Sequence, residues 1–298
     1  MRKIILVAGA TGNIGLRIVK ALVREGAEIR VLVRSNTPAD KLAALELPGV
    51  SVYTLNNWNY EELKRACDDV ACVVSALAGL REVIIDAQKV LLDAALAAGV
   101  LRFIPSDYSL DFTKFKHGEN RNLDWRREFH AYLNNLPIRS TSVFNGAFAE
   151  LLTTDMPMIL FKQKMILYWG NADYRWGFTT MDNTAAYTAK VALDPAAPRY
   201  LVIAGDQISP REVHAMMSEL TGQTFRLFRP GGKGLLGAII RITRKLAPGK
   251  NELYPAWQGM QYMHNMIDER SKIAKLHNDR YQGLQWTNVR TVISEHLK

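Results

Sequence analysis

Short apolar runs alternate with amphipathic segments along the first 106 residues. The run 3–8 is almost continuously apolar, as expected of a strand that is buried on both faces. Ile14, Ile18 and Leu22 then repeat at helical spacing, and Gly26 is placed to end that helix. Because parallel strands need crossover connections, the pattern predicts an α/β fold with a doubly wound parallel sheet. The further strands are expected at 28–33, 50–55, 70–76 and 101–106, with helices at 41–45, 61–67 and 83–98.

The alternation breaks after residue 107. A polar segment precedes a predicted helix at 123–134 and a strand at 138–144, and an aromatic, Met-rich stretch follows. The strand-like run 200–204 is expected to rejoin the sheet, and Ser209 with Pro210 has the signals of a helix start. We therefore predict a sheet domain and a smaller, partly interleaved C-terminal domain. The first comprises 1–150 with 176–206 rejoining it, and the second comprises 151–175 and 207–298.

A glycine-rich turn follows the first strand and opens the first helix, with the spacing G-x-x-G-x-x-G. In a βαβ unit this is the context of a dinucleotide fingerprint. Gly9 allows the tight turn, Gly12 lets the backbone approach a pyrophosphate, and Gly15 lets the helix pack closely on the strand. The free N–H groups of the helix N-terminus suit phosphate. The turn predicts an NAD(P)-binding Rossmann domain, with the C-terminal domain left to bind substrate. The expected contacts are Gly9, Thr11, Gly12, Asn13, Ile14 and Gly15.

The ends of the next strands carry polar residues that suit the rest of a dinucleotide. The second strand ends at Arg34, where an acidic residue would favour NAD and an arginine accommodates a 2′-phosphate. Ser35 offers a further donor, so NADP(H) is favoured over NAD(H). Asn56 ends the third strand, where an amide can hydrogen-bond adenine. Ser75 and Ala76 end the fourth strand, beside the expected nicotinamide-side ribose.

The chain resembles the NmrA-like group of atypical short-chain dehydrogenases/reductases, which includes the isoflavone and phenylcoumaran benzylic ether reductases. The resemblance implies NAD(P) binding on a Rossmann domain and a small C-terminal domain that closes over the nicotinamide. On its matching segments we assign cofactor contacts to Pro105, Ser106, Phe144 and Asn145. The resemblance rests on the glycine turn, Val31-Leu-Val-Arg34, Arg102-Phe-Ile-Pro-Ser-Asp-Tyr108, Trp176-Gly-Phe-Thr-Thr-Met-Asp-Asn-Thr-Ala185 and Trp286-Thr-Asn-Val-Arg290.

One departure from that group concerns its acid/base residue. The isoflavone reductase group uses a lysine at the start of the helix after the fifth strand, ahead of a strand matched here by Leu136-Pro137 and Val143-Phe-Asn145. The positions upstream, 120–127, contain no lysine. No Tyr-x-x-x-Lys pair occurs in that helix either. Another group must supply the proton if this chain catalyses a reduction.

Three residue types can replace the missing lysine. Tyr108 follows Ser106 near the expected nicotinamide face, but a hydroxyl with a reference pKa of about 10 needs a neighbouring cation. Lys114 or Lys116 on the next loop can supply it, unless both are simply solvated. Arg121 can orient a carbonyl or carboxylate but does not titrate usefully. We predict Tyr108 and Lys114 as catalytic residues, with a packing tyrosine as the alternative for the first.

Composition and charge narrow the possible partners. The net charge of +9 is dispersed except for one basic run, 241–250, so we expect an anionic cofactor and no nucleic acid. The segment 233–250 indicates a basic amphipathic helix that either covers the domain or contacts anionic lipid. With two cysteines, and six histidines without ligand spacing, we expect a reducing compartment and no metal site. Neither a signal peptide nor a membrane span is recognised, which predicts a cytoplasmic protein.

Two functions from different classes remain. The first is an NADPH-dependent reductase of a small aromatic, quinone-like or enone substrate, which the long stretch 148–176 favours as a pocket. The second is a non-catalytic NAD(P) sensor of the NmrA type that acts through a protein partner, which the missing lysine favours. The sequence predicts neither the substrate nor the oligomeric state.

Overall fold

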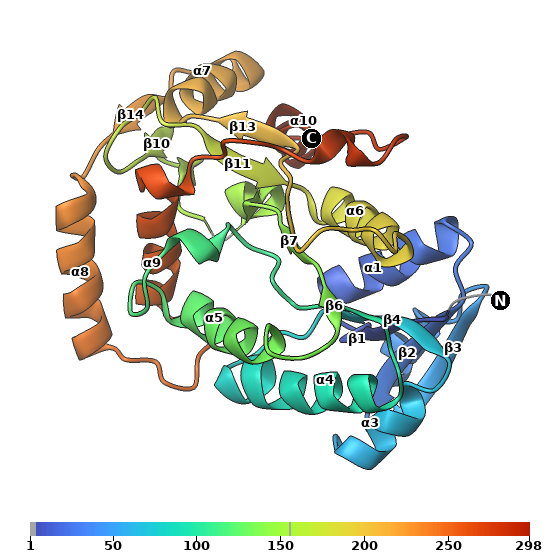
Figure 1. The fold of residues 1–298 in the computed structure, drawn as a ribbon. Helices are drawn as coiled ribbons and strands as arrows, with labels where there is room; N and C mark the ends of the chain where they lie inside the picture. Colours follow the sequence, from blue (N-terminus) through green and yellow to red (C-terminus); the bar gives the residue numbers. More distant parts are fainter. Residues whose placement is uncertain (1–3, 155) are drawn as a thin grey trace.

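A six-stranded parallel sheet forms the centre of the N-terminal lobe in the computed structural model, which describes residues 4–154 and 156–298 (Figure 1). The strand order is β3-β2-β1-β4-β5-β6, and every neighbouring pair is parallel. This order confirms the predicted doubly wound sheet of a Rossmann fold. The strands are β1 (Ile4–Ala8), β2 (Ile29–Arg34), β3 (Val50–Leu55), β4 (Val70–Ser75), β5 (Arg102–Ile104) and β6 (Arg139–Ser140).

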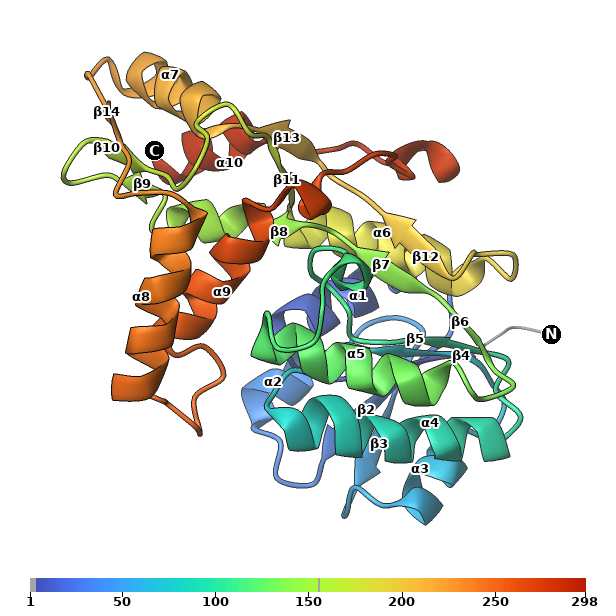
Figure 2. The same ribbon diagram turned by 60° about the vertical axis from the view of Figure 1, so that its left-hand side comes forward.

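Helices cover both faces of this sheet, because each central strand is apolar on both sides. Ile5 and Val7 of β1 are buried against α1 and α6, whereas Leu6 and Ala8 are buried against the opposite helices. Figure 2 shows α6 lying beside α1 on one face of the sheet and α3, α4 and α5 on the other. The helices of this lobe are α1 (Asn13–Arg24), α2 (Ala39–Ala43), α3 (Tyr60–Ala66), α4 (Gln88–Ala97), α5 (Arg121–Leu133) and α6 (Met181–Leu193).

Most of the elements predicted in this lobe lie within a few residues of the observed ones. The strand 50–55 matches β3 fully, and Gly26, with a φ of 72°, follows α1 as expected. The predicted helix 83–98 differs, because its first part, Glu82–Ala87, is π-helical and only the rest is α-helix. A π-helical turn widens the backbone locally and is common beside functional sites. The first predicted residue of the first strand, Lys3, lies outside the described residues.

The strand expected at 200–204 does not join the six-stranded sheet. Instead β12 (Tyr200–Val202) pairs in parallel with β7 (Ser142–Phe144), which continues the chain just after β6. The pairing of β5 with β6 ends before Pro105, which has no N–H to donate to a neighbouring strand. Beyond that point β7 therefore pairs with β12 in a separate two-stranded sheet.

The C-terminal lobe has its own apolar core, made of methionine, aromatic and aliphatic side chains. Helix α7 begins at the predicted position, where Ser209 and Glu212 form a capping box around Pro210. Gly146, with a φ of 69°, lets the chain cross Gly177 closely where this lobe begins. No described helix is long and apolar enough to cross a membrane. The α-helices are α7 (Pro210–Thr221), α8 (Lys233–Leu246), α9 (Ala256–Met266) and α10 (Val289–His296).

Short strands and 3₁₀ turns complete the C-terminal lobe and its junction with the first. Strand β11 lies between β13 and β8, and β10 lies between β14 and β9. These strands are β8 (Ala147–Phe148), β9 (Ile159–Leu160), β10 (Met165–Leu167), β11 (Trp176–Thr179), β13 (Asp206–Ile208) and β14 (Arg226–Phe228). The 3₁₀ turns are η2 (Phe112–Lys114), η3 (Ala149–Thr153), η4 (Glu269–Ser271) and η5 (Asn278–Arg280).

A buried polar network joins the end of β5 to α5 and β7. Asp107 is 1% exposed, and its Oδ2 lies 2.5 Å from Nε2 of His130 and accepts a hydrogen bond of 2.6 Å from Oγ of Ser142. Arg199, just before β12, donates to the same Oγ at 2.7 Å. Burial alone would raise the pKa of Asp107, but His130, Ser142 and Arg126 outweigh it and hold that pKa below its usual value. The network therefore stabilises the fold above about pH 4, and this contribution is lost as the pH falls further.

We expect His130→Ala to lower the free energy of unfolding by about 3–5 kcal/mol, because it leaves the carboxylate of Asp107 buried without its main partner. Urea unfolding at neutral pH measures this loss. Arg290→Ala is the control, because it removes an exposed ion pair to Glu219 and should leave stability close to that of the wild type. Equal stability of the two variants would contradict the role given to the network.

Candidate functional site

The three glycines of the turn after β1 lie in three different steric environments. Gly9 has a φ of 81°, and a Cβ there would lie 2.6 Å from the carbonyl oxygen of Ala76. A Cβ on Gly15 would lie 2.0 Å from the carbonyl oxygen of Gly9, so α1 can approach the turn only without a side chain. A Cβ on Gly12 would lie 3.3 Å from its nearest neighbour, the carbonyl oxygen of Gly9, and Gly12 is exposed. Gly12 therefore leaves open surface beside the turn. Gly9 and Gly15 instead allow the turn to pack closely against Ala76 and against α1.

The N-terminus of α1 is open to an anion. In the described chain no side chain caps this helix, and its first turn holds no acidic residue. Asn13 is exposed, and its Oδ1 accepts a hydrogen bond of 3.0 Å from Nε of Arg17. Arg17 also pairs with Asp182 in the first turn of α6. Free N–H groups beside a guanidinium form an electropositive site of the kind that binds a diphosphate. Thr11 and Ile14 are half-buried in the same turn.

The ends of β2 and β3 enclose a hollow of about 240 Å³ that is lined by Arg34, Ser35 and Asn56. The guanidinium of Arg34 is exposed and forms no ion pair within the described residues. The loop after β3 is held by Glu62, whose carboxylate accepts from the backbone N–H of Asn56 at 2.8 Å. Trp58, which sequence reasoning missed, closes one side. The structure thus brings the three residues expected at the adenosine end into one hollow.

The ends of β4 and β5 hold the residues expected at the nicotinamide end. Ser75 is fully buried, and its Oγ has no hydrogen-bond partner among the described residues. The Oγ of Ser106 donates to the carbonyl of Leu77 at 2.6 Å, and its N–H donates to Oε1 of Gln88 at 3.0 Å. Arg126 donates to the carbonyl oxygen of Ser106 at 3.0 Å. The turn at Ser106 is therefore held through its side chain and its backbone.

Gln88 and Arg126 were not identified from the sequence. Gln88 is 1% exposed, and it lies where the π-helical turn meets α4. The available signal was that Gln88 falls at helical spacing from the apolar residues Ile84, Leu91 and Leu92, because a buried amide needs a fixed partner. Arg126 gave no such signal, because an arginine on a polar helix usually contacts solvent.

The end of β7 contributes the last two expected cofactor contacts. Asn145 is fully buried, its N–H donates to the carbonyl of Ser109 at 3.0 Å, and its carbonyl accepts from Oγ1 of Thr179 at 2.7 Å. Neither atom of its side-chain amide has a partner in the described part of the chain. Such atoms are rare in folded proteins unless a ligand or water serves them. Together with Ser75 and the open surface at Gly12, this amide fits a bound dinucleotide.

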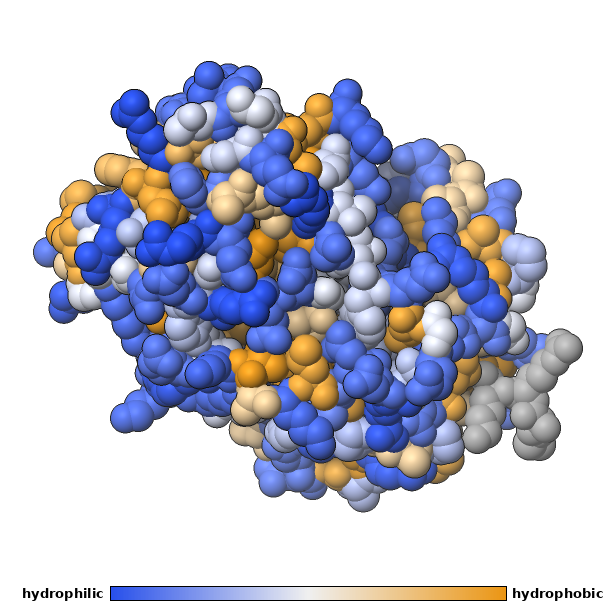
Figure 3. Space-filling view, turned by 90° about the horizontal axis from the view of Figure 1, so that it is seen from above, coloured by the Kyte–Doolittle hydropathy of each residue, from blue (hydrophilic) through white to orange (hydrophobic). Residues whose placement is uncertain are grey.

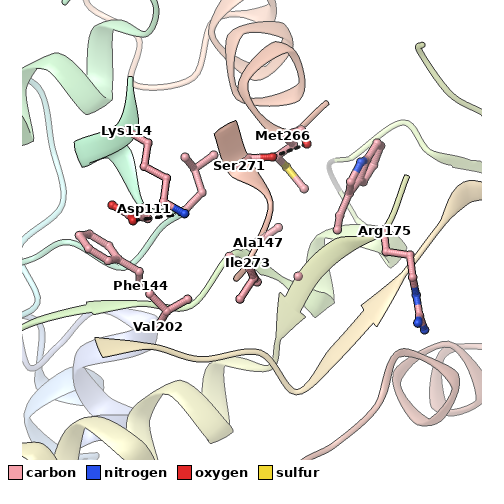
Figure 4. Close-up of a pocket in the computed structure, with 13 residues that line it drawn as sticks. Asp111, Lys114, Phe144, Ala147, Arg175, Val202, Met266, Ser271 and Ile273 are labelled. Carbon is pink, nitrogen blue, oxygen red and sulfur yellow. Dashed lines mark hydrogen bonds and ion pairs between the residues drawn. The ribbon is translucent and has the colours of Figure 1, made fainter. Parts of the chain in front are cut away.

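A second pocket lies between the two lobes (Figure 4). Phe144 lines it from β7, Trp176 from β11, and Met266 with Ile273 from the segment after α9. Its free interior volume is about 30 Å³, room for about one water molecule. The walls are aromatic and aliphatic, so the pocket suits an apolar ring once it widens.

Lys114, one of the two predicted catalytic residues, lines this pocket. Its Nζ lies 3.7 Å from Oδ2 of Asp111 and donates to the carbonyl oxygen of Lys272 at 3.2 Å. Figure 4 shows Lys114 and Asp111 pointing toward each other and Arg175 pointing away. Lys116 does not line the pocket. The structure therefore distinguishes the two loop lysines that the sequence left as alternatives.

Tyr108, the other predicted catalytic residue, lies in the apolar core between the sheet and α6. Burial raises the pKa of its hydroxyl well above the usual value, and the carboxylate of Asp107 adds to this. A hydroxyl with such a pKa is a poor acid near neutral pH, so this conformation disfavours proton donation from Tyr108. Arg121 is also occupied, because its guanidinium lies 4.8 Å from the ring centres of both Trp125 and Trp257.

The segment 266–273, here called the strap, lines the pocket through Met266, Ser271 and Ile273 and forms ion pairs with both Glu119 and Lys233. Arg270 donates to the carboxylates of Glu119 and Asp268 at 2.9 Å, and Lys233 also pairs with Asp268. These contacts, with Arg270 foremost, hold the pKa of Asp268 below its usual value. Glu119 belongs to the loop after η2, so its ion pair with Arg270 joins the strap to the segment that precedes α5.

No three His, Cys, Asp or Glu side chains form a potential metal cluster among the described residues. Cys67 and Cys72 are buried thiols, and burial raises the pKa of Cys67 to about 12 and of Cys72 to about 11. Both cysteines are therefore uncharged near neutral pH, and they pack in the core of the first lobe.

Known proteins share this fold. Pinoresinol reductase 2 of Arabidopsis thaliana is 30% identical over 206 residues, which cover 64% of this chain. The chain matches 65% of the length of that relative. AtPrR2 solved with NADP+ and (+)pinoresinol has a TM-score of 0.80 at 21% identity over 99% of both chains. Leucoanthocyanidin reductase of Vitis vinifera, solved with NADPH, has a TM-score of 0.82 at 17% identity, also over 99% of both.

The family is shown by a match that spans most of the chain. The profile of the NmrA-like family covers residues 1–255, which include the glycine turn, the adenosine-end hollow and the loop that carries Lys114. The sequence resemblance to this group is thus confirmed. The chain belongs to the NmrA-like family.

Proposed function

We propose that this protein is an NADPH-dependent oxidoreductase that reduces a small aromatic, quinone-like or enone substrate. The observation that carries the proposal is the geometry of one sheet edge, where an open helix N-terminus at Gly12 and the hollow around Arg34 lie at the carboxyl ends of neighbouring strands. The relatives support it, because pinoresinol reductase 2 is named as a reductase and the solved neighbours contain NADP+ or NADPH.

The residues at this edge would hold NADPH in three parts. The N–H groups of α1 and the open surface at Gly12 would bind the diphosphate. Arg34 and Ser35 would bind the 2′-phosphate, and Asn56 would contact the adenine. The nicotinamide half would lie against the ends of β4, β5 and β7, where it would supply a hydride. The contacts there are Ser75, Ala76, Pro105, Ser106, Phe144 and Asn145.

Lys114 is the residue best placed to act on the substrate. Its side chain lines the pocket and is 37% exposed, so its ammonium group can reach the carbonyl oxygen of a substrate that enters between the lobes. The carboxylate of Asp111, 3.7 Å away, limits where this side chain can reach. We assign to Lys114 the polarisation of the substrate carbonyl and the delivery of the proton.

The alternative is a protein that senses NAD(P) and acts through a protein partner. The narrow pocket favours it, because about 30 Å³ does not admit an aromatic ring unless the strap moves. The missing family lysine favours it as well. An NADPH oxidation assay with quinones, enones and aldehydes separates the two functions, because a sensor turns over none of these substrates.

We expect Lys114→Met to lower kcat/KM for the best substrate of that panel by about 100-fold or more, with NADPH binding unchanged, because general acid catalysis contributes this order. Lys116→Met is the matched control, because this lysine is on the same loop outside the pocket and its loss should change kcat/KM little. Equal effects of the two substitutions would contradict the role of Lys114. If the wild type and both variants all lack activity, the result would favour the NAD(P)-sensing function.

We expect Arg34→Ala to weaken NADPH binding by about 10- to 150-fold and to leave NADH binding nearly unchanged, because only NADPH carries the 2′-phosphate. Rising salt should also reduce the wild-type preference for NADPH. Isothermal calorimetry measures both. Lys41→Ala is the control, because Lys41 is an exposed cation on the neighbouring helix α2 that does not line the hollow. Equal losses for both cofactors would show that Arg34 contacts the adenosine instead.

We expect Arg270→Met to speed amide hydrogen exchange in the strap by about 5-fold, which corresponds to about 1 kcal/mol for a partly exposed ion-pair cluster. Mass spectrometry of peptides from 266–273 measures the change. Arg211→Met breaks an exposed pair to Asp173 outside the strap and should leave this exchange as in the wild type. Unchanged exchange in Arg270→Met would show that the ions do not hold the strap over the pocket.

A further inference from the structure

Helix α8 buries one side and leaves an apolar stripe on the other. Leu236 and Ile240 are buried in the core of the C-terminal lobe, where α8 packs on α9. Leu235, Ile242 and Leu246 are 49%, 59% and 79% exposed. Their spacing of seven and four residues places these three side chains on one face of the helix. The stripe is therefore a continuous surface about 16 Å long, at 1.5 Å per residue.

Basic side chains flank this stripe. Arg241 and Lys245 each precede a stripe residue by one position, and both are exposed. Neither forms an ion pair or hydrogen bond with any described residue. Lys250 follows α8 and is also exposed and unpaired within the described chain. Because α8 contains no Asp or Glu, nothing on the helix itself neutralises these charges.

The position of α8 leaves the stripe accessible. The helix forms the outer edge of the C-terminal lobe, on the side away from the six-stranded sheet (Figures 1 and 2). Seen from above, apolar atoms gather at the left edge of the molecule, where α8 lies, with hydrophilic atoms beside them (Figure 3). Three large apolar side chains that stay in water on one face of a helix are unfavourable unless a partner covers them.

Charge decides which partner fits. A second copy of this chain would bring the same basic helix against itself around a two-fold axis, and the like charges of Arg241 and Lys245 would repel. An anionic lipid surface matches both features, because leucine and isoleucine side chains insert among the acyl chains and the cations meet the headgroups. Lys233 and Arg244 add to the field, although Lys233 pairs with Asp268 and Arg244 lies over Trp257.

We propose that the exposed face of α8 docks this protein reversibly on anionic membrane surfaces, with Leu235, Ile242 and Leu246 inserted and Arg241 and Lys245 on the headgroups. A peripheral contact of this kind needs no membrane span. It also does not depend on the cofactor or the pocket, so it stands apart from the proposed reductase activity.

Vesicle co-sedimentation of the full chain tests the proposal. The protein should partition to vesicles of phosphatidylcholine with phosphatidylglycerol and much less to phosphatidylcholine alone, and rising salt should weaken the binding. Arg241→Gln with Lys245→Gln should lower the partition coefficient by about 30-fold, at about 1 kcal/mol per charge. Ile242→Gln with Leu246→Gln should lower it by about 10-fold or more.

Leu101→Gln is the matched control, because Leu101 is 62% exposed in the other lobe and its loss should leave vesicle binding unchanged. Circular dichroism checks that each variant is folded. Three results would overturn the proposal: no binding to anionic vesicles, equal binding by the wild type and both α8 variants, or a wild-type dimer that Ile242→Gln with Leu246→Gln converts to monomer. The last would assign the stripe to a second copy of the chain.

Discussion

The contact between α1 and the glycine turn is the constraint on which the rest of the site depends. A Cβ at Gly15 would lie 2.0 Å from the Gly9 carbonyl oxygen, so the helix can sit at this distance only because no side chain is there. That distance aims the free N–H groups of α1 at the carboxyl edge of the sheet. The hollow at Arg34 and the ends of β4 and β5 share that edge, and β7 continues the chain just after β6, which is why one extended ligand can reach all of them.

The position of Lys114 in the pocket between the lobes depends on how rigidly the end of β5 is held. Gln88 and Arg126 bind the backbone of Ser106, and the next residue, Asp107, is fixed by His130 and Ser142. The loop that follows carries Lys114 into the pocket between the lobes. Oδ2 of Asp107 has both His130 and Ser142 as partners, whereas Oδ1 has none among the described residues, so the loop is fixed through one carboxylate oxygen. The strap adds a contact that can open, because its ion pairs are partly exposed.

The sequence predicts the parts of this structure that local patterns encode. Apolar runs such as 70–75 follow from burial, and the glycine spacing follows from the need for positions without a Cβ atom. The sheet, its helices and the residues lining the Arg34 hollow could therefore be placed. The pairing of β12 with β7 could not, because the two strands lie about 60 residues apart in the chain and no local pattern encodes which strand β12 joins. Tyr108 shows the same limit, since no local pattern tells whether a tyrosine at a strand end faces the core or the cofactor.

Calorimetric titration of the wild type and of Gly12→Val with NADPH and NADH tests the central claim most directly. The Gly12 site has room for the backbone but little for a branched side chain beside a diphosphate. We expect the wild type to bind NADPH at least about 10-fold more tightly than NADH. We expect Gly12→Val to bind neither while circular dichroism shows it folded. Unchanged NADPH affinity in Gly12→Val, or no binding of either cofactor by the wild type, would contradict the assignment of the glycine turn as a dinucleotide site.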